Sequence, residues 1–124
     1  MKNFNQIKKG GFKLEPCIYA KTIKEIECYL YYKKQIAEIL EKESKGLATD
    51  RDLSKRAMMQ YYVKVIDSAE KYIPLDYRAA IKEHLIEGSE YEYLERKYYV
   101  TTSSMKRYTQ AFVWAVSKEL GEDF

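Results

Sequence analysis

The sequence is poor in the residues from which metal, nucleotide and redox sites are built. Only two cysteines and one histidine occur among its 124 residues, too few for a cluster of Cys and His ligands. The pair Gly10-Gly11 lacks the flanking strand and helix that a phosphate-binding loop requires. The one histidine, His84, falls inside a short predicted helix, where packing is its usual role. We therefore expect no metal, no cofactor and no enzymatic activity.

Long apolar runs are also missing. No stretch approaches the length of a membrane span, and Met1 is followed by polar and basic residues rather than by the apolar core of a secretory leader. We therefore expect a cytoplasmic protein with no membrane contact. In that compartment Cys17 and Cys28 are expected to be reduced and structural.

The chain has no strong excess of either charge, but its basic residues are unevenly placed. It carries 22 basic and 19 acidic residues, a net charge of +3. Residues 1–13 nevertheless contain four lysines and no acid, and residues 96–118 contain five basic residues and no acid. Two basic stretches inside a nearly neutral protein indicate a surface that meets a polyanion.

Residues 1–16 show little periodicity, but hydrophobic spacing is helical along the rest of the chain and predicts an all-α protein of about five helices. We expect a flexible basic arm over residues 1–19 and a pair of long helices over residues 20–72. The first of these helices opens with a capping box at residues 22–25, has Leu30 and Leu40 among its regularly spaced apolar residues, and ends near Gly46. Its apolar face could pack on the C-terminal unit or associate with another copy. The second runs from Asp50 to Tyr72, ahead of Pro74. We expect one compact domain overall.

Residues 73–124 are predicted to hold three shorter elements. They are a helix over residues 75–86 that closes at Gly88, a two-turn helix opened by a capping box at residues 89–92, and a last helix that begins near Thr101 or Thr102 and ends at Leu120. This order of short helix, very short helix, tight turn and long helix is the layout of a helix-turn-helix unit, whose last helix enters the major groove.

The last predicted helix begins with four hydroxyl residues and continues into a basic pair, Lys106-Arg107. A Thr-Thr-Ser-Ser run by itself is more often an ordinary helix cap, and a basic pair by itself is usually a solvated surface. A helix start also presents unpaired N–H groups and a positive dipole, both of which favour phosphate. The combination with the element order predicts contact with DNA.

The segment 73–108 contains a distinctive set of residues: Pro74, Tyr77, Arg78, Glu87, Gly88, Tyr91, Glu92, Leu94, Val100, Thr101, Ser104, Met105 and Lys106. At these positions it resembles region four of bacterial sigma factors. More closely, the chain resembles small phage-encoded transcriptional regulators of the ArpU and RinA type, which end in a similar unit. The resemblance implies sequence-specific binding of double-stranded DNA in the control of phage or prophage transcription, as an activator of late genes.

The resemblance and the chemistry of the side chains together give the candidate site. Three residues depart from the family pattern: Glu95 replaces a tightly packed alanine, Tyr99 replaces the usual glycine of the turn, and Thr109 replaces a common leucine. We expect Tyr99 to resist a left-handed conformation and to give a turn of another type. The residues expected to contact bases are Thr102, Ser103, Ser104, Lys106, Arg107 and Gln110, and those expected to contact the DNA backbone are Tyr91, Arg96, Lys97 and Thr101.

The sequence is also compatible with two other functions. A DNA-packaging protein like a phage terminase small subunit also combines a helix-turn-helix with oligomerising helices, and its large ring would distinguish it. A helical interaction protein could instead bind RNA polymerase without touching DNA, and weak salt dependence would then distinguish it. Tyrosines on the first two helices could form the surface of a homodimer or pack within one subunit.

Overall fold

The computed structural model describes residues 13–121, and all regular structure in this part is helical. The all-α fold class is therefore confirmed. The first twelve residues of the expected basic arm lie outside the described part. The elements are α2 (Pro16–Glu27), α3 (Tyr29–Ser44), α4 (Asp50–Ala69), η1 (Glu70–Tyr72), η2 (Leu75–Tyr77), α5 (Arg78–Lys82), η3 (Glu83–Glu87), α6 (Tyr91–Tyr98) and α7 (Thr102–Leu120).

The first helix begins earlier than the sequence pattern predicted. α2 starts at Pro16, in the first turn, where the missing N–H of proline costs nothing. Residues 16–19 are therefore helix and not arm. The capping box predicted at residues 22–25 was wrong: Thr22 is fully buried in mid-helix, and its hydroxyl donates to the carbonyl of Ile18 at 2.8 Å. A threonine inside a helix can donate its hydroxyl to the carbonyl four residues earlier, and its sequence pattern is then the same as that of a threonine that caps a helix start.

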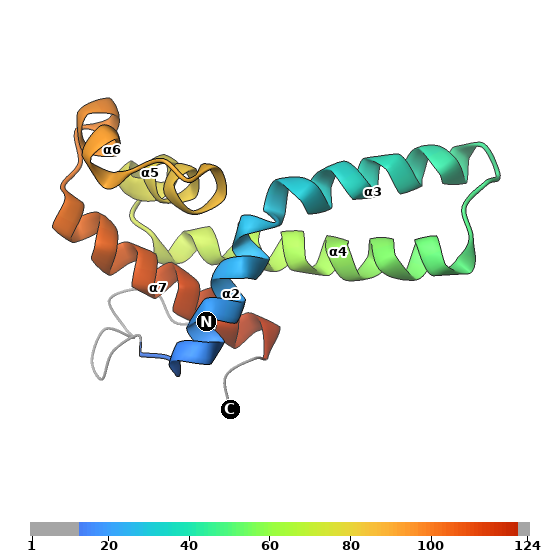
Figure 1. Cartoon of the computed structure of the whole chain (residues 1–124), viewed down its shortest axis with the longest axis horizontal. Coiled ribbons are helices and arrows are strands. Elements are labelled where there is room, and N and C mark those ends of the chain that lie inside the picture. Colours follow the sequence, from blue (N-terminus) through green and yellow to red (C-terminus); the bar gives the residue numbers. More distant parts are fainter. Residues whose placement is uncertain (1–12, 122–124) are drawn as a thin grey trace.

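The expected single first helix is divided at Cys28, and for this reason the described residues contain six α-helices instead of about five. Cys28 ends α2, and Tyr29 begins α3. The chain turns sharply between the two helices (Figure 1). α2 packs mainly against α7 and η3, whereas α3 packs mainly against α4. The bend falls where the packing partner of the chain changes.

Helices α3 and α4 form an antiparallel pair, called the hairpin below, which projects from the rest of the molecule (Figure 1). Gly46 follows the end of α3 with a φ of 70°, as expected for a residue after a helix end. Thr49 caps α4 with a complete capping box that includes Asp52. The expected bounds of the second helix are confirmed, with a final 3₁₀ turn at Glu70–Tyr72.

The body of the molecule comprises α2, the C-terminal end of α4 and all elements from η1 to α7. The helix predicted over residues 75–86 is present as η2, α5 and η3 in succession, of which η3 is a π-helical turn. Gly88 ends it with a φ of 79°. The capping box predicted at Ser89 was wrong, because α6 has Glu90 at its N-cap and no side-chain cap there.

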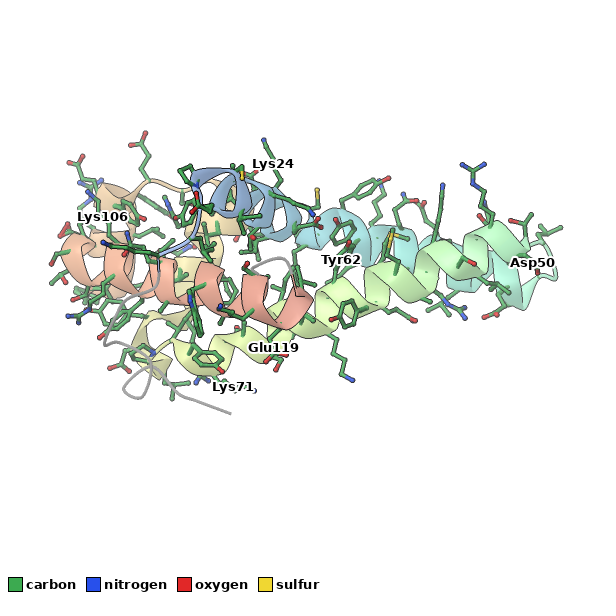
Figure 2. All side chains as sticks on the ribbon, turned by 90° about the horizontal axis from the view of Figure 1, so that it is seen from below. Lys24, Asp50, Tyr62, Lys71, Lys106 and Glu119 are labelled. Atoms are coloured by element: carbon green, nitrogen blue, oxygen red, sulfur yellow. The ribbon has the colours of Figure 1, made fainter. Side chains whose placement is uncertain are left out.

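Helix α7 lies at the centre of the body. Its residues Met105, Phe112, Val113 and Val116 are fully buried, and α2, α4, α5 and α6 all contact it. The core cluster joins these residues to buried residues of α2, α4, η1, α5, η3 and α6. Along the long axis of the molecule, Lys106 near the start of α7 lies at one end, and Asp50 at the tip of the hairpin lies at the other (Figure 2).

Candidate nucleic-acid interface

The connection between α6 and α7 is a three-residue turn. Tyr99 has φ 55° and ψ 47°, so it adopts the left-handed conformation that it was expected to avoid. That expectation was wrong, and the physical reason is visible in its surroundings. The Tyr99 side chain is 93% exposed and meets no obstacle, while its neighbour Val100 is buried and fixes the turn to the core. Burial of Val100 offsets the local cost at Tyr99, of about 1 kcal/mol.

The start of α7 is fixed by hydroxyl groups. The Thr101 side chain accepts a hydrogen bond from the backbone N–H of Ser104 at 3.3 Å, and so acts as the N-cap. The Thr102 hydroxyl donates to the Glu95 carboxylate at 2.6 Å and joins α7 to α6. Glu95 departs from the alanine of the family pattern, and this bond gives its side chain a place between the two helices.

One face of the first three turns of α7 points to solvent. Ser103, Lys106, Arg107 and Gln110 are all exposed, and they follow one another at the three- and four-residue spacing of a single helix face. Met105, on the opposite side, is fully buried. No acidic residue occurs in this stripe. The structure therefore brings four of the six predicted base-contacting residues together on one surface, called the α7 stripe below.

The two cations of the stripe lie over aromatic rings. The Lys106 ammonium is 5.8 Å from the centre of the Tyr91 ring, and that ring is stacked on His84 at 4.0 Å. The Arg107 guanidinium lies 5.0 Å from the centre of the Tyr108 ring. Such contacts orient a cation without covering it. Both side chains remain exposed and are not folded into the body.

Tyr77, the last residue of η2, supports the start of α7. Its ring meets the Tyr108 ring edge to face at 4.9 Å. Hydrogen bonding with the hydroxyls of Ser104 and Thr101 lowers the pKa of the Tyr77 phenol. Ser104 is partly buried on this side, so it lies off the α7 stripe.

Glu83 joins η3 to α6, and its role was not predicted from the sequence. It is almost fully buried and accepts three hydrogen bonds, each of 2.7 Å, from the Ser89 and Tyr98 hydroxyls and the Lys97 ammonium. The bonds from Lys97, Tyr98 and Ser89 lower the pKa of the Glu83 carboxyl to about 2. The same contact with Glu83 raises the pKa of Lys97.

The predicted backbone-contacting residues therefore differ in their surroundings. Lys97 is bound to Glu83, and Tyr91 lies beneath Lys106. Arg96 pairs with Glu92 at 3.7 Å, but both side chains are mostly exposed, and such pairs exchange readily with solvent or other partners. Arg96 is therefore the cation of α6 that can most easily turn to another anion.

Residues 13–121 contain no group of three or more potential metal ligands, and no helix among them is long and apolar enough to cross a membrane. Comparisons with known proteins give no relative for this chain: no protein-family model matches it, and neither a curated protein nor a solved structure is significantly similar. A function for the candidate interface is therefore argued from its geometry and chemistry alone.

Proposed function

We propose that α6, the turn at residues 99–101 and α7 form a helix-turn-helix that binds double-stranded DNA, with the α7 stripe in the major groove. The observation that carries the proposal is the α7 stripe itself. Four donor-bearing side chains share one exposed face at the capped start of a helix whose opposite face is anchored in the core. On this proposal the protein regulates transcription from phage or prophage promoters, activating late genes as in the family that it resembles.

Each side chain of the stripe has a suitable partner on DNA. Arginine binds the O6 and N7 atoms of guanine with two hydrogen bonds, which suits Arg107, and glutamine binds adenine in the same manner, which suits Gln110. Lys106 and Ser103 can donate to bases or to nearby phosphates. The unpaired N–H groups at the start of α7 favour a phosphate at that end.

Two of the residues predicted to contact DNA are not part of the proposal. Thr102 and Lys97 already hold carboxylates within the protein, so we leave them out of the proposed contact surface. Glu90 and Glu92 at the start of α6 disfavour a phosphate there. Arg96, near the end of α6, is instead the proposed contact with the DNA backbone.

The test begins with a selection of bound fragments from random duplexes. Binding of the best duplex by Arg107→Ala is then measured by fluorescence anisotropy at several salt concentrations. Loss of a base-reading arginine is expected to cost about 1–3 kcal/mol and to relax preference at one base pair. Lys45→Ala serves as the matched control, because it removes the same charge near the tip of the hairpin. Equal affinities of the Arg107 variant and the parent would refute the assignment.

The salt series separates this function from its alternatives. Binding through several phosphates weakens steeply as salt rises, whereas a protein interface with RNA polymerase alone would weaken little. A packaging protein would instead assemble into a large ring, which the mass of the particle in solution reveals. A shallow salt dependence or a ring-sized particle would therefore count against the proposed regulator.

A further inference from the structure

The two cations of the α7 stripe are held in different ways. The Arg107 guanidinium lies 5.0 Å from the centre of the Tyr108 ring, and one of its N–H groups also donates to the Tyr108 hydroxyl at 3.2 Å. The Lys106 ammonium lies 5.8 Å from the centre of the Tyr91 ring, and this contact is with the ring face. A contact with a ring face limits distance, whereas a hydrogen bond to a planar guanidinium also sets its orientation.

The Tyr108 ring is itself supported by Tyr77. The two half-buried rings meet edge to face at 4.9 Å. The Tyr77 oxygen accepts hydrogen bonds from the hydroxyls of Ser104 and Thr101, and these bonds lower the pKa of the phenol. Thr101, Ser104 and Tyr108 follow one another at intervals of three and four residues, which places them on one side of the start of α7. A series of contacts therefore runs from two hydroxyls through two rings to Arg107.

The orientation of an arginine decides whether it can read a base. Two of its N–H groups must meet the O6 and N7 atoms of guanine in one plane. A long side chain that samples many rotamers loses this freedom on binding, and a contact that already holds it reduces the loss. Because a guanidinium has several N–H donors, Arg107 can bond the Tyr108 hydroxyl and a base at the same time.

We propose that Tyr108, supported by Tyr77, is a positioning residue that holds Arg107 in the orientation with which it reads one base pair. The inference rests on the proposed function and deepens it, because it names what makes Arg107 selective. Tyr108 acts through Arg107 and not by touching DNA. Preference at the base pair that Arg107 reads therefore depends on the Tyr108 hydroxyl, whereas general affinity for DNA depends mainly on charge.

The test measures preference at single base pairs, with the full chain and the duplex selected for the proposed function. The base pair that Arg107 reads is the one at which Arg107→Ala relaxes preference. Tyr108→Phe keeps the ring and removes the hydroxyl, so it should reduce preference at that base pair by about three- to tenfold, measured by fluorescence anisotropy. Preference at the other base pairs should not change.

A double variant and a matched control sharpen the result. Tyr108→Phe added to Arg107→Ala should cause no further loss, because the hydroxyl then has no guanidinium to hold. Tyr91→Phe is the matched control, since it removes the same hydroxyl from the ring that lies against Lys106, the other cation of the α7 stripe. It should leave preference at the base pair of Arg107 unchanged. A fold that had merely loosened would lose preference at every base pair.

The outcomes separate this inference from the proposed function. If Arg107→Ala leaves binding unchanged, both are overturned. If Arg107→Ala relaxes one base pair and Tyr108→Phe does not, the positioning role alone is overturned. An equal loss from Tyr108→Phe with and without Arg107 would also overturn it, because Tyr108 would then act independently of the arginine.

Discussion

Helix α7 in the body is buried on most of its circumference, whereas α3 in the hairpin meets the rest of the chain along one side. The core cluster gathers buried residues from α2, α4, η1, α5, η3, α6 and α7, and α3 contributes to it through Tyr29, its first residue. Further out along the hairpin, Ile39 and Met59 are the two buried apolar residues, and neither belongs to that cluster. The body therefore holds the α7 stripe from several sides, whereas each helix of the hairpin is held mainly by the other.

The largest expected contrast is between a core residue of each region. Phe112→Ala removes a fully buried ring from the body and should lower the free energy of unfolding by about 3–5 kcal/mol. Ile39→Ala in the hairpin should cost about 2 kcal/mol or less, because two helices can close over the space more easily. Chemical denaturation of both variants measures the difference. Equal losses would show that the hairpin is as well packed as the body.

The second contrast concerns carboxylates. The pKa of Glu83 is about 2 in the folded protein, against an ordinary value of 4.5, so its ionised form favours folding. This contribution is present in full above pH 4.5 and is lost as the pH falls toward 2. Glu83→Gln should therefore lower the thermal midpoint at pH 7 and flatten its fall in acid.

Glu43→Gln in the hairpin is the control for that experiment. Its partnership with Arg56 is partly exposed, and exposed pairs add little to stability. The melting curve of this variant should follow that of the parent from pH 7 down to pH 3. An equal shift in the two variants would remove the special role assigned to Glu83.

A smaller effect is expected from a buried hydroxyl in α7. Thr109 is almost fully buried, and its hydroxyl has no hydrogen-bond partner within the described part of the chain. Thr109→Val keeps the shape and removes the unpaired group, so stability should rise by about 1 kcal/mol. Thr22→Val should instead lower stability, because the Thr22 hydroxyl is bonded to Ile18. Urea denaturation of both variants tests whether the two signs differ.

The smallest contrast lies in two turns with left-handed residues. Tyr99→Gly should raise stability by about 0.5–1 kcal/mol, because glycine adopts this conformation without strain. Gly46→Ala, at φ 70° in the hairpin turn, should lower it by about 1 kcal/mol. Thermal denaturation gives both shifts. A loss of stability in Tyr99→Gly would mean that the tyrosine ring contributes more than its exposure suggests.

Glycine, proline and helix-capping residues predicted the ends of most of the helices correctly. Gly46, Pro74 and Gly88 ended elements where the sequence pattern expected, and Thr101 capped α7. The same kind of signal failed at Thr22 and at Ser89. In both places the hydroxyl found another partner: a carbonyl one turn earlier for Thr22, and a carboxylate six residues away for Ser89. A short pattern cannot show which of several acceptors will be near once the chain has folded.

The candidate site was predictable to a similar extent. The basic pair and its helix followed from spacing and composition, and the exposure of Lys106 and Arg107 agrees with that hypothesis. The roles of Glu83 and Glu95 did not follow, since their partners come from other elements. The left-handed Tyr99 did not follow either, because its cost is local and the burial of Val100 that offsets it is tertiary.

Apolar residues at helical intervals, interrupted by glycine and proline, were enough by themselves to specify an all-α chain and the order of its helices, because backbone hydrogen bonding and helix ends depend on near neighbours. Tertiary packing alone decided the bend at Cys28, the exposure of Leu30 and Leu40, and the burial of Glu83. Each of these depends on which distant surfaces meet, and that is set by the total area that the whole chain can remove from water.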